Sequence, residues 1–205
     1  MKIAVWGAKG RVGLAIVKIA KLRMHQVFEV DKNNYATFDT PCDVVIDFSL
    51  PTATQHVASY CKKHNTPLVV GTTGHSEYQL AILDELKQHV EVVAKANFSK
   101  GMDIVAQISK QIALHTGWDV AIVEKHRKGK MDTPSGTAKM LANLLDCKDV
   151  CSLRVGNEFG THTVVFGGVD EQIEISHRAT SVDVFALGAV ESAEKLINNI
   201  AKNVP

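Results

Sequence analysis

The sequence predicts an α/β protein: a Rossmann-like parallel sheet domain, followed by a second α+β domain with a mixed or antiparallel sheet. In residues 1–98, short apolar strands alternate with helical patterns, as is typical of a parallel sheet. Later, three strands follow one another closely, at residues 152–155, 162–166 and 172–177, which favours antiparallel pairing. A long helix over residues 181–203 is expected to return to the first domain.

The individual elements are predicted from runs of Val, Ile and Leu for strands and from helical spacing of apolar residues for helices. In the first domain they are a strand at 2–6, a helix at 14–20, strands at 27–31 and 43–49, a helix at 51–64 opened by Pro51-Thr52, a strand at 67–70, a helix at 76–88 and a strand at 90–94. In the second domain a helix at 101–115, a strand at 120–124 and a helix from about Ser135 to Leu145 precede the three close strands. We expect residues 1–98, completed by 179–205, to bind a dinucleotide, and residues 99–178 to bind substrate and form oligomer contacts.

Composition narrows the class of function. The formal net charge of the 205 residues is +1, which argues against nucleic acid as a partner. No apolar run reaches the roughly 18 residues of a membrane span, and no signal-peptide pattern opens the chain, so we expect a cytoplasmic protein without membrane attachment. The four cysteines are scattered, and the nine histidines form no HxH or HExxH arrangement. We therefore expect reduced cysteines and no metal site.

A glycine turn follows the first strand. Gly7, Gly10 and Gly13 are spaced as GxxGxxG, and Lys9 stands where the common dinucleotide fingerprint has its second glycine. Glycines here permit positive φ and let the backbone approach a pyrophosphate, while the next helix points its N-terminus at the phosphates. The residues expected to contact the cofactor are Gly7, Ala8, Lys9, Gly10, Arg11 and Val12.

The second strand ends on Asp31, at the distance expected of the acid that binds the adenosine ribose, although a solvated strand-end acid is an equal alternative. The next residue, Lys32, could instead pair with a ribose phosphate, so NADH and NADPH both remain open. Ligands of open parallel sheets lie beyond the carboxyl ends of the strands. This adds further expected cofactor contacts from the ends of two later strands: Gly71, Thr72, Thr73, Lys95, Ala96, Asn97 and Phe98. Thr73 is also expected to contact the substrate.

The segment from Glu124 to Ala138 predicts a site for an anionic substrate. His126, Arg127, Lys128 and Lys130 crowd the space before a helix that starts near Ser135. The free N–H groups and positive dipole end of that helix favour a carboxylate or phosphate. Taken alone, the segment is more typical of a solvated basic loop followed by a capped helix, and the dinucleotide-type N-terminus is what favours a substrate site.

Taken together, these features resemble the dihydrodipicolinate reductase family of bacterial lysine and diaminopimelate synthesis. The resemblance covers nearly the whole chain, and its most specific part is the cationic segment with Asp132-Thr133-Pro134-Ser135-Gly136-Thr137. The other matching segments are the turn from Gly7 to Gly13 and residues 47–49, 70–74, 96–101, 160–162, 174–179 and 185–189.

The resemblance implies a reductase that passes hydride from NADH or NADPH to a cyclic unsaturated dicarboxylate. The family's proton donor or acceptor histidine falls on His126 and its proton-donating lysine on Lys130. Gly136 and Thr137 fall on substrate-carboxylate contacts next to Ser135, and Arg127 stands where many relatives have a second histidine. Arg127 keeps carboxylate affinity but cannot donate its proton in the same way.

The resemblance also implies a homotetramer assembled through the second domain. Two other functions are compatible with the glycine turn: another two-domain NAD(P)-dependent dehydrogenase of the aspartate or homoserine type, and a non-catalytic dinucleotide sensor. Neither gives a reason for the arrangement from His126 to Thr137.

Overall fold

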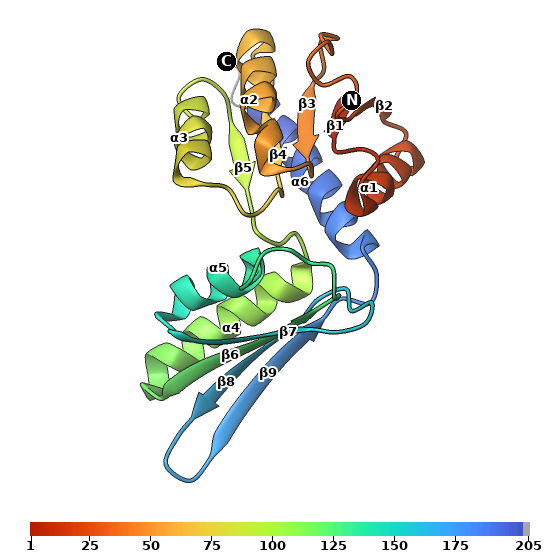
Figure 1. Ribbon diagram of the computed structural model, residues 1–205. Coiled ribbons are helices and arrows are strands. Elements are labelled where there is room, and N and C mark those ends of the chain that lie inside the picture. The colour runs from red at the N-terminus through yellow and green to blue at the C-terminus, as the bar shows by residue number, and fades with distance from the viewer. Residues whose placement is uncertain (203–205) are drawn as a thin grey trace. The chain divides into compact units, whose positions relative to one another are not determined.

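The computed structural model describes residues 1–202 (Figure 1). The chain divides into two compact units, one formed by Met1–Phe98 with the chain from Val182 onward, the other by Ser99–Ser181. Residue 203 of the predicted final helix, and residues 203–205 of the predicted first domain, lie outside the described residues.

The first unit is built on a five-stranded parallel sheet. Its strands are β1 (Lys2–Trp6), β2 (Gln26–Val30), β3 (Val44–Asp47), β4 (Leu68–Val70) and β5 (Val92–Ala94), in the order β2-β1-β3-β4-β5. Each strand pairs in parallel with its neighbours. The parallel sheet predicted from the alternating pattern is therefore confirmed.

Helices cover both faces of this sheet. The residues of β1 alternate between the two cores: Ile3 and Val5 pack with α1 (Arg11–Leu22) and α6 (Asp183–Lys202). Ala4 and Trp6 face the opposite side, with α2 (Thr54–His64) and α3 (Glu77–Leu86). The short 3-10 helix η1 (Pro51–Ala53) leads into α2. The final helix thus completes the first unit, as the sequence predicted.

The second unit holds a mixed four-stranded sheet of β6 (Asp119–His126), β7 (Asp149–Arg154), β8 (Thr161–Gly167) and β9 (Gln172–Arg178), in the order β7-β6-β8-β9. The β8–β9 pair is antiparallel, as predicted. The prediction for the first of the three close strands was wrong, because β7 pairs with β6, in parallel, and not with β8. The helix α5 (Gly136–Leu145) connects β6 to β7, and such a crossover returns the chain in parallel.

The face of this sheet that packs on α4 (Lys100–Thr116) and α5 changes from apolar to polar along the strands. On β6 the inward residues run from Ile122 to Glu124 and His126, and all three are buried. On β8 they run from Phe166 and Val164 to His162. Polar groups are therefore buried together at one end of an otherwise apolar core.

None of the helices within residues 1–202 is long and apolar enough to cross a membrane.

The backbone of Phe98 lies in close contact with α6 at Gly188. A Cβ atom at Gly188 would lie 1.8 Å from the Phe98 carbonyl oxygen, so Gly188→Ala forces the helix away from the strand-end backbone. We expect urea unfolding to show a loss of roughly 2–3 kcal/mol of stability. The matched control is Gly167→Ala, where the added atom meets nothing within 4 Å among the described residues. Equal stabilities of the two variants would contradict this account of Gly188.

Candidate active site

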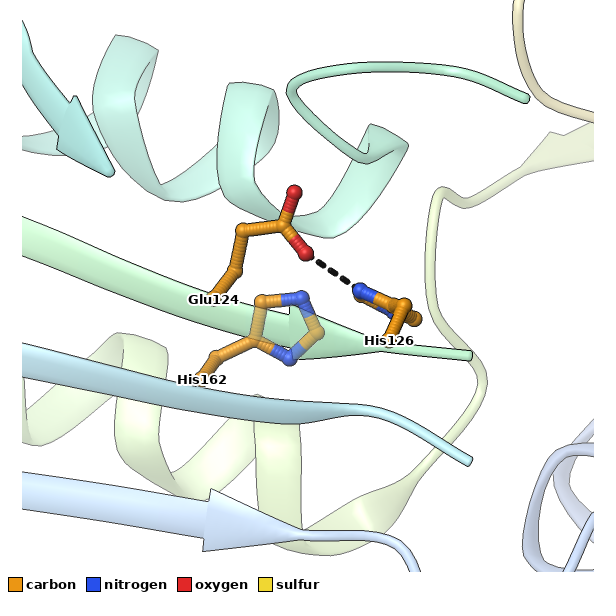
Figure 2. A group of neighbouring side chains, drawn as sticks. All are labelled: Glu124, His126 and His162. Atoms are coloured by element: carbon orange, nitrogen blue, oxygen red, sulfur yellow. Dashed lines mark hydrogen bonds and ion pairs between the residues drawn. The ribbon is translucent and has the colours of Figure 1, made fainter. Parts of the chain in front are cut away.

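A buried carboxylate, Glu124, organises the polar end of the second sheet. The residue has no exposed surface, and His126 Nδ1 is hydrogen bonded to its Oε2 (Figure 2). Its other oxygen, Oε1, accepts the Arg154 Nη2–H group at 2.8 Å and the Ser135 backbone N–H at 3.2 Å. Burial alone would raise the pKa of Glu124, but hydrogen bonds from side chains, with that of Arg154 the largest and that of His126 adding to it, outweigh burial and bring the pKa to about 2. Glu124 is therefore ionised.

His126 is held in one orientation by that carboxylate. Burial, aided by the positive charges of Lys130 and Arg154, lowers the pKa of His126 although Glu124 acts to raise it. A neutral imidazole with its proton on Nδ1 donates to Glu124 and keeps a lone pair on Nε2. A Cβ atom at Gly160 would come within 3.0 Å of that Nε2, so the glycine makes room for the ring.

The loop after β6 is tied to the same centre by Arg154. Besides Glu124, its Nη2 donates to the Asp132 carbonyl oxygen at 2.7 Å and to Thr133 Oγ1 at 3.1 Å. The Asp132 carboxylate in turn bridges two groups: Oδ1 pairs with Lys130 Nζ at 2.7 Å, and Oδ2 accepts the Gly136 N–H at 3.2 Å. Lys130 is thereby held next to the N-terminus of α5.

Ser135 caps α5. Its Oγ accepts the Ala138 N–H at 3.2 Å and lies 3.1 Å from His162 Nε2. The His162 ring meets the His126 ring edge-on, with 5.0 Å between centroids. Glu124, His126 and His162 are of the kinds that bind metal ions and offer ligand atoms within 4.8 Å of one another. Both Glu124 oxygens are already engaged, however, and Arg154 holds a positive charge beside them, so these residues suit a cation poorly.

Most of the predicted substrate residues meet at this centre. His126 lies on β6 itself, two residues after Glu124 and on the same face of the strand, and not in a loop as the sequence had suggested. Lys130, Ser135, Gly136 and Thr137 surround the α5 N-terminus, while the Arg127 guanidinium lies against Gly129 in the turn. Thr73 belongs to the first unit.

Four residues that build the centre had no role predicted from the sequence: Glu124, Asp132, Arg154 and His162. The signal for Glu124, Arg154 and His162 was a polar residue at an inward position of a strand, which needs a buried partner. Asp132 lies in the loop between β6 and α5 and carries no such signal.

The first unit holds a separate candidate site at the carboxyl ends of its strands. Gly7 has φ +78°, and a Cβ there would lie 2.5 Å from the Phe48 carbonyl oxygen. A Cβ at Gly13 would lie 2.0 Å from the Gly7 carbonyl oxygen. The turn therefore requires glycine at both positions, which brings bare backbone to the N-terminus of α1 and suits a pyrophosphate.

A cavity of about 340 Å³ adjoins this turn. It is lined by residues that include Gly7, Lys9, Gly10, Asp31, Lys32 and Tyr35. Lys9 Nζ lies 2.5 Å from Asp31 Oδ2, and the hydrogen bond from Lys9 lowers the pKa of Asp31, as does that from the Asn33 backbone N–H. A carboxylate beside two cations thus lies directly after β2 and next to the glycine turn.

The remaining predicted cofactor residues form the rim of the sheet. Asp47, buried at the end of β3, accepts Ser49 N–H at 2.9 Å and Thr72 Oγ1–H at 3.1 Å, and so links the loops after β3 and β4. The Phe48 ring fills the space in front of Gly71 and packs on Phe98, with 5.5 Å between ring centroids. Lys95 continues from β5 and donates its backbone N–H to the Val70 carbonyl at 3.1 Å.

Comparison with known proteins identifies the family of this chain. Residues 1–98 match the family model for the dihydrodipicolinate reductase N-terminus, and residues 101–204 match that for its C-terminus. A 4-hydroxy-tetrahydrodipicolinate reductase of Thermosipho africanus is 40% identical over 97% of this chain and 92% of its own length. One of Clostridium tetani is 32% identical over 94% of this chain and 90% of its own.

Solved structures share the fold. A dihydrodipicolinate reductase from Paenisporosarcina sp. TG-14, with dipicolinate bound, superposes with a TM-score of 0.71 at 19% identity, covering 97% of this chain and 95% of that one. An aspartate dehydrogenase from Thermotoga maritima gives 0.60 at 12% identity, covering 96% of each chain. The fold alone is therefore common to several dehydrogenases, whereas the two family models and the similar sequences single out one. The chain belongs to the dihydrodipicolinate reductase family, and it is an oxidoreductase of lysine and diaminopimelate biosynthesis with 4-hydroxy-tetrahydrodipicolinate reductase activity.

Proposed function

We propose that the second unit binds the cyclic unsaturated dicarboxylate and that His126 and Lys130 act on it as catalytic residues, while the first unit holds NADH or NADPH. Hydride adds to one carbon of the conjugated ring system, and the displaced electron pair must be taken up by a proton at the other end. Lys130, as an ammonium, donates that proton. His126, fixed by Glu124 through Nδ1, offers its Nε2 lone pair as a hydrogen-bond acceptor that orients a donor group of the substrate, and takes no proton in the reduction itself.

The main support for this proposal is that the Asp132 carboxylate contacts both Lys130 and the N-terminus of α5. One carboxylate already bridges Lys130 Nζ and the Gly136 N–H, with distances of 2.7 and 3.2 Å. These groups therefore have the spacing that a carboxylate needs, and a substrate carboxylate that enters the site takes over contacts now made by Asp132. Gly136 and Thr137 then receive it at the positive end of α5. Ser135 holds that end in place, and Arg127 adds positive charge nearby.

The cofactor site is assigned to the first unit. The backbone of the Gly7–Gly13 turn, with Arg11, would hold the pyrophosphate, and Asp31 the adenosine ribose. Residues after β4 and β5, among them Thr73 and Asn97, would surround the nicotinamide. A bound reduced dinucleotide supplies the hydride. Because Lys9 balances the charge of Asp31 and Lys32 adds a second cation, we propose that the site accepts both NADH and NADPH.

The expected assembly is a homotetramer in the cytoplasm. The edge strands β7 and β9 of the mixed sheet support self-association, because exposed edges need a partner or a cover. Sedimentation that gives only a monomer at micromolar concentration would contradict this assignment.

Turnover is the direct test. With substrate made freshly from pyruvate and aspartate semialdehyde by the preceding synthase, we expect loss of the reduced-nicotinamide absorbance with NADH and with NADPH. The loss should depend on that substrate. If a folded protein that binds dinucleotide oxidises neither cofactor, the proposed function is wrong.

Substitution at His126 or Lys130 is expected to lower turnover. His126→Asn keeps a donor near the Nδ1 position and removes Nε2, while Lys130→Met removes the acid. Each should lower kcat by roughly 10²- to 10⁴-fold while dinucleotide affinity changes less than about twofold. Lys125→Met is the control, since Lys125 is exposed and alternates to the other face of β6. Unchanged turnover in both site variants would remove the assignment.

The pH dependence should distinguish the two roles of His126. Its pKa lies below the ordinary 6.5, and the neutral form is the one that accepts at Nε2. We therefore expect kcat/KM to fall as the pH drops below 6.5 and through this lowered pKa, and to be independent of this group above it. A fall in kcat/KM as the pH rises through the same region would instead make His126 a proton donor.

The Lys9–Asp31 pair predicts a change in cofactor preference. Lys9→Ala removes a cation that a ribose phosphate would contact, so the ratio of kcat/KM for NADPH to that for NADH should fall by roughly tenfold. Lys21→Ala, which breaks an exposed pair with Glu29 at the other end of α1, should leave the ratio unchanged. Equal ratios in the wild type and Lys9→Ala would show that Lys9 does not contact the phosphate.

A further inference from the structure

A buried histidine, His162, and a half-buried one, His177, occupy equivalent positions in the mixed sheet. His162 on β8 and His177 on β9 are direct cross-strand partners. Each lies against a serine that caps a helix: His162 Nε2 is 3.1 Å from Ser135 Oγ, and His177 Nε2 is 3.0 Å from Ser99 Oγ. Ser135 begins α5 and Ser99 begins α4, each accepting a backbone N–H group of its own first turn. The sheet thus fixes both helix N-termini through the same kind of contact.

The two helix ends differ in what lies beside them. The first turn of α5 adjoins Lys130, Asp132 and the Glu124–His126 pair, whereas His177 packs against Gly101 at the start of α4. Only the His162 contact therefore bears on the groups proposed to receive a carboxylate.

His162 acts on the site through Ser135 and not through its own charge. It is 2% exposed, and burial lowers its pKa to about 3, so the ring is neutral at working pH. Its inward neighbours on β8, Val164 and Phe166, are apolar, and an apolar residue would fill this position at less cost than an imidazole whose Nδ1 has no partner among the described residues. The contact with Ser135 is the reason we give for a polar ring at this position.

Ser135 is held at two points. Its backbone N–H donates to Glu124 Oε1 at 3.2 Å, and its hydroxyl contacts both the Ala138 N–H and His162. The N–H groups of Gly136 and Thr137 follow directly, so their directions depend on how Ser135 is fixed. Loss of the His162 contact leaves the hydroxyl held by the Ala138 N–H alone and loosens the first turn.

We propose that His162 is a positioning residue for substrate binding, which holds the α5 N-terminus in the orientation that receives a substrate carboxylate. This inference rests on the proposed function of that helix end. It assigns His162 no contact with the substrate and no proton transfer.

The test uses amide side chains that imitate one ring nitrogen each. His162→Asn places its amide near Nδ1 and loses the bond to Ser135, whereas His162→Gln can reach the Nε2 position and keep it. His177→Asn is the matched control, because it removes the equivalent bond at α4. For each protein we would measure substrate KM, kcat, the Kd of dipicolinate, the Kd of NADPH and the melting temperature.

We expect His162→Asn to raise the substrate KM and the dipicolinate Kd by roughly 5- to 20-fold, with a smaller change in kcat and none in the NADPH Kd. His162→Gln should recover most of that loss. His177→Asn should lower the melting temperature comparably but leave KM and the dipicolinate Kd within about twofold of wild type. If His162→Asn lowers only the melting temperature, as His177→Asn does, the inference is wrong.

Ser135→Ala keeps the inference testable if His162→Asn does not fold, since it removes the other partner of the same bond. It should raise KM and the dipicolinate Kd similarly, and an unchanged Kd would overturn the inference. If the wild-type protein binds dipicolinate but does not reduce the substrate, the proposed reaction is wrong. The role of His162 in binding is then decided by the dipicolinate Kd of the variants.

Discussion

The second unit depends on one buried charge. Glu124 is fully enclosed, and an isolated carboxylate there would be too costly to bury. It is ionised because β6, β7 and the α5 cap each supply a donor, through His126, Arg154 and the Ser135 N–H. Removing any one of these leaves a buried charge with fewer partners, so the three elements are fixed relative to one another by the same requirement. A substitution at any of the three donors is therefore expected to change folding stability as well as the geometry of this centre.

The charges around Glu124 are arranged so that cations remain available to an anionic ligand. Arg154 is already hydrogen bonded to Glu124 and to the loop oxygens of Asp132 and Thr133. His126 and His162 are neutral, because burial lowers the pKa of each. This leaves Lys130 and the positive end of α5, which Asp132 now occupies. An internal carboxylate in this position gives the cation and the helix end a counter-charge in the absence of the substrate carboxylate that we propose binds there.

The fold was largely predictable from the sequence because apolar spacing and the Gly7 turn are local signals. The pairing of β7 was not, since the short connections after it favoured β8, and only the α5 crossover makes the β6 pairing parallel. Within the site, His126, Lys130 and Ser135 could be named because they stand in one segment. Arg154 and His162 come from other strands and meet that segment only in the folded sheet. Sequence separation also concealed the Lys9–Asp31 contact, although both residues were candidates.

The position of the site follows from the ends of secondary structure and not from the loop charge alone. A strand alternates its side chains, so Glu124 and His126 share the inward face while Lys125 is exposed between them. A helix that starts above that face adds unpaired N–H groups, which need an acceptor whether or not substrate is present. Asp132 and Ser135 supply acceptors from the chain itself. The same need that caps α5 thus creates the place where we propose that a substrate carboxylate binds, by replacing Asp132 at Gly136 while Ser135 keeps its own contact.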